Sequence, residues 1–252
     1  MKEKILVLAK AYPVISKTYD NLVCVAGVTE AGELRRIYPV PWKVFWNHKG
    51  FKKKQWIEIE SLGKKTDDSR EESRKVDVST IKNLEEASWE TIKEYVQKNL
   101  TTYNDLKKKV KETNISIGFV KPQLIDFVKE KRSDIVLQKI ETKKKQTTLG
   151  SDFESGEIKS AAKIEEFEDN FCYVFTDDSS GEKHQLNCID WEAGELYRKY
   201  PDREVGFQKL RERFLDDFKK KPEIYFMLGT HHRYKTLMII AIIYPKQTDI
   251  TK

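Results

Sequence analysis

Four short segments with the character of β-strands fall within the first 62 residues, and this crowding constrains the fold more than any other feature of the sequence. Residues 4–10 and 21–28 are apolar and rich in Val, Leu and Ile, as buried strands are. A turn at residues 30–33 leads into residues 34–38, and residues 55–61 alternate apolar and polar side chains. Four strands in so short a span predict a small β-barrel or a tightly curled sheet.

The rest of the chain predicts a mixture of helices and strands. Ser88, the pair Thr102 and Asp105, and Asp190 stand where helix N-caps are expected. Apolar runs over residues 224–228 and 237–244 indicate strands covered on both faces. The other predicted segments are helices 89–99, 103–111, 191–200 and 205–219 and strands 115–120, 135–140, 171–176 and 184–189. We therefore expect an α+β protein with a basic β-barrel-like N-terminal module, a helical middle and a β-α-α-β-β C-terminal part.

Changes in composition predict where the chain divides. Residues 63–75 are polar and show no apolar period, which is typical of an exposed connector. Residues 141–160 are rich in Lys, Thr, Ser and Gly and hold few bulky apolar side chains, which indicates a linker or mobile loop. The predicted parts are the basic module 1–62, a helical and mixed segment 63–140, the linker 141–163 and the α+β part 164–252.

The basic excess of the chain is confined to its first 65 residues, which hold 13 Lys and Arg against 6 Asp and Glu. The other 187 residues hold 34 basic and 35 acidic side chains. Aromatic rings interleave with these cations, and such a mixture suits nucleic acid because bases stack on rings and phosphates pair with cations. Alternatively, the rings form a satellite core under a loop. The nucleic-acid-binding residues predicted here are Arg35, Arg36, Tyr38, Trp42, Lys43, Trp46, His48, Phe51, Lys52, Lys53 and Lys54.

A second polar cluster lies in the turn between the two apolar strands near the C-terminus. His231, His232, Arg233 and Lys235 fall within five residues there. We expect these side chains to extend a phosphate-binding track, with Arg233 and Lys235 as the cations. Two alternatives stay open, which are a general base supplied by either histidine and an ordinary polar hairpin.

Metal-binding patterns are weak. Cys172, His184 and Cys188 lack the paired spacing of zinc ligands, and both cysteines stand among apolar residues as core fillers do. Asp190 and Glu192 could hold a divalent cation, but acids also favour a helix start, with Trp191 as a core anchor. We therefore expect no metal, no cofactor and no catalytic residue.

Several stretches together resemble a family of uncharacterised prokaryotic proteins. They are residues 24–28, 36–42, 55–57, 190–192, 196–198, 226–231 and 244–245. The resemblance spans most of the chain and implies that its two ends fold as one recurring unit, but it implies no activity. Where the family pattern carries cysteine before the Asp-Trp-Glu stretch, this chain has Thr176 and Asp177, which further disfavours zinc.

The longest apolar run, residues 237–244, is too short to span a bilayer, and three widely spaced cysteines argue for a reducing compartment. We expect a cytoplasmic protein without membrane contact. Its predicted function is non-catalytic nucleic-acid binding as an accessory subunit of a larger nucleic-acid-directed complex, such as a defence complex, with a protein partner. One alternative is a metal-dependent nuclease or phosphoryl-transfer enzyme using His231 or His232 with Asp190 and Glu192. The other is a structural adaptor that contacts only protein.

Overall fold

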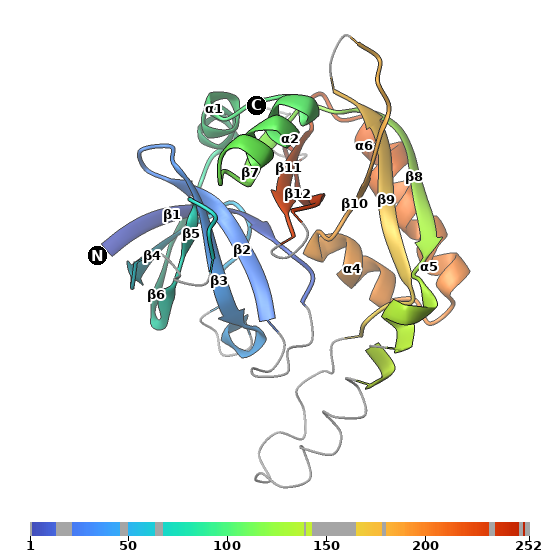
Figure 1. Ribbon diagram of the computed structural model, residues 1–252, viewed down its shortest axis with the longest axis horizontal. Helices are drawn as coiled ribbons and strands as arrows, with labels where there is room; N and C mark the ends of the chain where they lie inside the picture. The colour runs from blue at the N-terminus through green and yellow to red at the C-terminus, as the bar shows by residue number, and fades with distance from the viewer. Residues whose placement is uncertain are drawn as a thin grey trace, which may run out of the picture.

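A curled six-stranded sheet forms the N-terminal part of the computed structural model (Figure 1), which describes residues 2–13, 22–45, 50–63, 68–138, 140–142, 165–177, 180–231, 235–246 and 249. The strand order is β5-β3-β2-β1-β4-β6, and only the β3–β5 pair is parallel. The strands are β1 (Lys2–Lys10), β2 (Leu22–Thr29), β3 (Leu34–Pro41), β4 (Gln55–Ser61), β5 (Ser73–Arg74) and β6 (Val76–Glu86). The predicted α+β class and barrel-like module are confirmed.

The strands β1 and β2 are buried on both faces of this sheet. On β1, Ile5 and Val7 point into the core inside the curl, while Leu6 and Leu8 join a second core outside it. This alternation follows from the two-residue period of a strand. It explains why β1 and β2 read as near-continuous apolar runs rather than as half-exposed strands.

Two smaller antiparallel sheets belong to the C-terminal part. One has the order β12-β11-β7 and the other β10-β9-β8. Their strands are β7 (Ile117–Val120), β8 (Gln123–Lys131), β9 (Asp169–Thr176), β10 (His184–Asn187), β11 (Tyr225–Thr230) and β12 (Leu237–Ile243). The β11 and β12 strands lie between the six-stranded sheet and the C-terminal helices (Figure 1), and every residue of β11 is buried.

The helices begin where the sequence predicts caps. Ser88, Thr102 and Asp190 each accept a hydrogen bond from a first-turn N–H. The predicted helix 205–219 forms as α5, a π-helical turn (η2) and α6. The helices are α1 (Trp89–Lys98), α2 (Tyr103–Glu112), α4 (Trp191–Arg198), α5 (Arg203–Arg211), η2 (Glu212–Asp216) and α6 (Asp217–Lys219).

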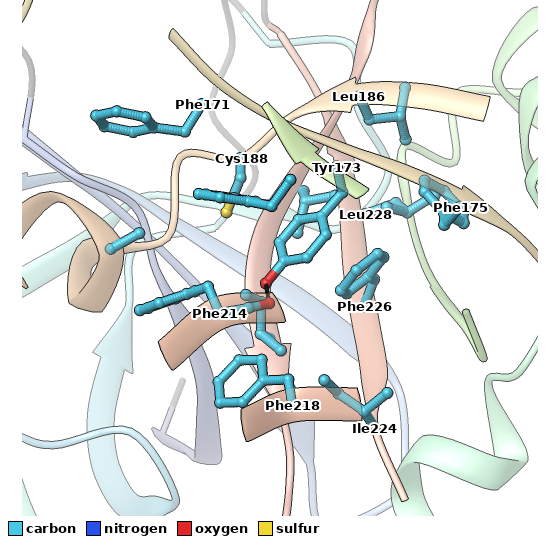
Figure 2. Packing of buried hydrophobic residues seen from close by; sticks show 14 of the residues in the cluster. Phe171, Tyr173, Phe175, Leu186, Cys188, Phe214, Phe218, Ile224, Phe226 and Leu228 are labelled. Atoms are coloured by element: carbon cyan, nitrogen blue, oxygen red, sulfur yellow. Dashed lines mark hydrogen bonds between the residues drawn. The ribbon is translucent and has the colours of Figure 1, made fainter. Parts of the chain in front are cut away.

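An aromatic core joins the C-terminal sheets to these helices (Figure 2). The Tyr173 hydroxyl donates to the carbonyl oxygen of Phe214 in the π-helical turn, and the Tyr173 ring lies 4.8 Å from that of Phe226. Burial raises the pKa of Tyr173 well above its usual value. A buried hydroxyl with a partner avoids the cost of an unmade hydrogen bond, so this contact also fixes the helix position.

Two local expectations are corrected, and two strands were missed. Residues 134–138 and 140–142 are helical, although residues 135–140 were expected to form a strand. The stretch 63–75 is not an exposed connector throughout, since Asp68 and Glu72 are 3% and 5% exposed. The strands β6 and β8 were not predicted, because their mixed side chains show only a weak two-residue period.

The two parts of the chain share a core. Leu6 and Leu8 of β1 and Ile92 of α1 pack in one cluster with Tyr225 and Ile240 of the C-terminal strands. Most of the predicted linker 141–163 lies outside the described residues, and the division at residues 62, 140 and 163 stays a prediction. Among the helices that the structure describes, none is long and apolar enough to cross a membrane.

Candidate nucleic-acid interface

The connection between β3 and β4 crosses one end of the curled sheet. In the sheet β2 and β1 separate β3 from β4, and the described arms of the connection, residues 42–45 and 50–54, lie at the ends of these strands. The connection begins as a 3-10 turn, η1 (Trp42–Phe45), and the Lys54 N–H at its end donates to the Val7 carbonyl at 2.7 Å. We call the rim the end of the sheet formed by Lys10, Leu22, Pro41 and Gln55, over which this connection passes.

Described contacts hold both arms of the connection at the rim. The Phe45 ring meets the rings of Phe51 and Trp191 edge-on, at centroid distances of 4.9 and 5.2 Å. A Cβ on Gly50 would come within 2.9 Å of the Phe45 carbonyl, so the close approach of these two residues requires glycine. Residues 45 and 50, which flank the segment between them, therefore lie next to each other at the rim.

Phe51 is 1% exposed and belongs to the core inside the curl, with Phe45 and Trp191 packed against it. This placement agrees with the interpretation in which loop rings form a satellite core. It also confirms Trp191 as a core anchor at the start of α4. A base cannot stack on a buried ring, so we leave Phe51 out of the proposed interface.

Lys53 is buried and tied to α4. Its Nζ lies 2.8 Å from Asp190 Oδ2 and 3.0 Å from Glu192 Oε1. Burial by itself would lower the pKa of Lys53, but the two carboxylates outweigh it and raise that pKa well above its usual value. Asp190 also accepts from the N–H groups of Glu192 and Ile242, both at 2.8 Å. Lys53 is therefore a structural cation that joins the rim to α4 and β12.

Two further lysines at the rim are part-buried without a carboxylate contact in the described part of the chain. Lys10 Nζ donates to the Phe51 carbonyl at 3.1 Å, and Lys54 Nζ donates to the Tyr244 carbonyl. Burial, followed for Lys10 by the neighbouring Lys53 charge, lowers its pKa to about 8. Burial likewise lowers the pKa of Lys54 to about 8.

The remaining predicted cations of the N-terminal part are mostly paired with acids. Arg35 contacts Glu3 and Glu33, and Lys52, with a side chain 76% exposed, lies 3.4 Å from Glu86. Arg36 is 2% exposed, donates to Cys24 Sγ and Ser116 Oγ, and faces Glu72 at 3.9 Å. Tyr38 is half-buried on β3. Trp42 and Lys43 lie in η1, and their side chains are outside the described part of the structure. Four further predicted residues lie wholly outside it, namely Trp46, His48, His232 and Arg233.

The second predicted cluster lies at the opposite end of β12. His231 and Lys235 are exposed and close a turn in which the Lys235 N–H donates to the His231 carbonyl at 3.2 Å. The turn joins Thr230 to Leu237, whereas Lys54 contacts Tyr244, just beyond the other end of the strand. Seven residues of strand separate the two places, which is roughly 20 Å. The structure does not bring the turn and the rim together.

The same separation bears on the catalytic alternative. Asp190 binds the N–H of Ile242 near one end of β12, while the His231 N–H donates to Thr236 before its other end. Asp190 is 1% exposed and has three donors on its carboxylate. The acids and His231 are therefore not assembled into one site, while His232 lies outside the described residues, and Asp190 acts as a helix cap and ion-pair partner.

The cysteines and His184 occupy structural positions. Cys172 and Cys188 are each 4% exposed, and burial raises the pKa of the Cys172 thiol to about 12. His184 Nε2 lies 3.3 Å from Asp177 Oδ1, and its ring packs on Tyr103 at 4.3 Å. Among the described side chains, no group of three or more His, Cys, Asp and Glu is arranged to hold a metal ion.

A shallow groove of about 340 Å³ adjoins the rim beyond Tyr244. The α4 residues Glu192 and Leu196 form one wall, and Arg213 of the π-helical turn contributes to the other. The Tyr244 hydroxyl donates to Glu192 Oε2 at 3.1 Å. Because the lining holds three acids, Glu192, Glu212 and Asp217, and two basic residues, Lys209 and Arg213, the groove does not extend a basic surface.

Sequence reasoning missed Lys10. It ends an apolar strand and carries no motif, so only the sheet order reveals that it lies beside the β3–β4 connection. The one available signal is its position, since a lysine at the end of a buried strand must place its charge at the edge of the sheet. The partner of Lys53 was equally hidden, because Asp190 is distant in sequence.

Comparison with known families divides the chain after α1. Residues 99–252 match the model described as a domain of unknown function, DUF8757, and the chain belongs to this family. Residues 1–98, which hold the six-stranded sheet and α1, match a second domain of unknown function, DUF8758.

None of the curated proteins matches the chain. Among solved structures, it is similar to a chain of "Structure and Conformational Change of a Replication Protein A Heterotrimer Bound to ssDNA", with 10% identity and a TM-score of 0.36. The alignment covers 100% of this chain and 50% of that chain, so this chain spans about half its length. A TM-score this low does not indicate a shared fold.

Proposed function

We propose that the protein binds nucleic acid without catalysing a reaction, and that the β3–β4 connection at the rim is its contact surface. The proposal rests on the position of the β3–β4 connection. The segment richest in both rings and cations crosses the end of the sheet, and the contacts of Phe45, Gly50 and Lys53 hold its two arms there.

The proposed contacts divide by chemistry. Trp42 and Trp46 offer rings for stacking, while Lys43, His48 and the exposed Lys52 offer charges for phosphates. The surplus of basic side chains within the first 65 residues favours this end of the molecule over the C-terminal part. Arg36 and Lys53 are left out because both are buried and hydrogen-bonded within the protein.

A non-catalytic role is supported by the separation of the acids from His231 across β12. We therefore propose an accessory subunit, which would hold nucleic acid for a partner protein. The surface of the C-terminal part beyond the rim would then be available to that partner.

Binding of a fluorescent single-stranded oligonucleotide, measured by anisotropy, tests the proposal. Replacing both tryptophans, W42A together with W46A, should weaken binding by about 30-fold or more, because stacking contributes ~1–3 kcal/mol per base. The logarithm of affinity should fall linearly with the logarithm of salt concentration. The fold of the variant is checked by thermal unfolding.

A second comparison removes two positive charges either at the rim or, as the matched control, on a distant helix. K43A with K52A should weaken binding and reduce the salt slope by about 1.4, whereas K107A with K111A on the exposed face of α2 should leave the slope nearly unchanged. Equal effects of the two pairs would mean that charge alone, and not the rim, attracts the ligand. No binding at low salt would end the proposal.

A further inference from the structure

We infer that Lys10 holds a phosphate of the bound strand at the rim, an inference that rests on the proposed function and names a residue outside the predicted set. Lys10 is the last residue of β1, and its Nζ donates to the carbonyl oxygen of Phe51 at 3.1 Å. That contact places the ammonium group directly beside the arm of the connection that leads to β4.

Two aromatic rings fix the position of this ammonium group. Lys10 Nζ lies 5.0 Å from the centroid of the Phe45 ring and 4.8 Å from that of Trp191. A cation over ring faces is attracted by their electron density, but rings supply no hydrogen-bond acceptor. An ammonium group has three donors, and the Phe51 carbonyl uses one of them. The remaining donors suit an anionic oxygen.

Charge counting at the rim leads to the same conclusion. Lys10 and Lys53 lie there with two carboxylates, Asp190 and Glu192, whereas Lys54 is also acted on by the charge of Asp249. Lys53 lies against both carboxylates, so among the described residues Lys10 is left with no acid within ion-pair distance. A surplus cation that is partly removed from water costs free energy unless an anion compensates it. A phosphodiester supplies that anion.

Binding of a phosphate at Lys10 should change the protonation of this side chain, which binding at a fully exposed lysine would not do. Burial and the Lys53 charge lower the pKa of Lys10 to about 8, while the more distant charges of Glu192 and Asp190 raise it. A bound phosphate favours the protonated form, so binding should take up a proton when the pH exceeds 8. If the charge of Lys10 strengthens binding threefold to tenfold, a free-protein pKa of about 8 means that affinity should fall about twofold to fivefold from pH 7 to pH 9 on account of this one group.

The experiment measures anisotropy of a labelled single-stranded oligonucleotide from pH 7 to 9 at several salt concentrations. It compares the wild type with K10Q and with K2Q, which removes an exposed lysine from the other end of the same strand. K10Q should lower affinity at pH 7 about threefold to tenfold, lower the salt slope by about 0.7, and remove part of the pH dependence. Lys54 titrates in the same range, so the difference between wild type and K10Q is the diagnostic quantity.

The outcomes distinguish a failure of the inference about Lys10 from a failure of the proposed function. If the wild type binds and K10Q matches K2Q in affinity, slope and pH profile, Lys10 holds no phosphate and the inference fails while the proposed function stands. If the wild type does not bind at all, the proposed function fails. Inorganic phosphate serves as a second probe: protection of Lys10 against amine acylation by phosphate alone would mean that the site takes a free anion rather than a strand. Thermal unfolding of K10Q confirms that the variant is folded.

Discussion

The two ends of β12 both join the N-terminal sheet to the C-terminal part, but they differ in charge balance. Beyond Ile243, Lys53 binds the carboxylates of Asp190 and Glu192, Lys54 is acted on by the charge of Asp249, and Lys10 has no acid within ion-pair distance among the described residues. Near Leu237, the two arginines Arg36 and Arg70 meet the two carboxylates of Glu72 and Asp68, and the Arg70 guanidinium also donates to the Thr230 carbonyl at 3.2 Å.

This difference separates a structural role from a binding role. Where buried charges are balanced, as near Thr230, the arginines and carboxylates compensate one another within the protein. Where a part-buried cation has no paired acid, as Lys10 has none at the rim among the described residues, the protein retains an attraction for anions. Abundance of lysine and arginine alone does not make this distinction, because Arg36 and Lys53 are as basic as Lys10.

The largest expected effect comes from breaking the ion pair at the rim. D190A would leave Lys53 buried with only Glu192 and would remove the N-cap of α4. We expect a loss of about 3–5 kcal/mol in the free energy of unfolding, measured by urea denaturation. E195A, which breaks an exposed pair with Arg198, should cost below about 1 kcal/mol. Similar costs for the two variants would contradict the structural role of Asp190.

A smaller effect is expected at the balanced end. In D68N the donors of Arg70 and Ser73 lose a charged acceptor, and we expect a loss of about 2 kcal/mol. Burial would raise the pKa of Asp68, but hydrogen bonds from Arg70 and Ser73 outweigh it and hold that pKa well below its usual range. This stabilisation is present above the usual Asp range and is lost as the pH falls below about 4.

The difference between wild type and D68N should therefore shrink in acid, which urea denaturation at pH 3 and pH 7 would show. Oligonucleotide affinity of folded D68N should equal that of the wild type. A weaker affinity would place this end of β12 in the interface after all.

The smallest effect concerns stability in mild alkali. Lys10 has a lowered pKa in the folded protein, so the unfolded chain binds more protons between about pH 8 and pH 10.5. Its contribution to the free energy of unfolding therefore rises with pH across that window. The stability of the wild type relative to K10Q should increase from pH 7 to pH 9, as measured by thermal unfolding. A difference that stays constant with pH would show that Lys10 is solvated rather than part-buried.

Much of the fold follows from local sequence signals. The caps Ser88, Thr102 and Asp190 and the apolar runs of β1, β2 and β12 identify their elements, because caps and periodicity act within a few residues. The helical residues 134–138 and 140–142 and the strands β6 and β8 were missed, since tertiary packing decides segments whose local preference is weak.

The candidate site was less predictable. Composition located the basic region, but whether a lysine is free or paired depends on partners distant in sequence, as with Lys53 and Asp190. The burial of Phe51 and Arg36 likewise arises from how β3, β4, β7 and α4 come together. No pattern along the chain encodes these contacts.

Hydrogen–deuterium exchange with and without a saturating single-stranded oligonucleotide compares the two ends of β12 in one experiment. The account predicts slower exchange in peptides covering residues 8–13 and 40–55 and no change in peptides covering residues 229–236. Protection of the 229–236 peptides alone, or of neither region while the oligonucleotide is bound, would contradict it.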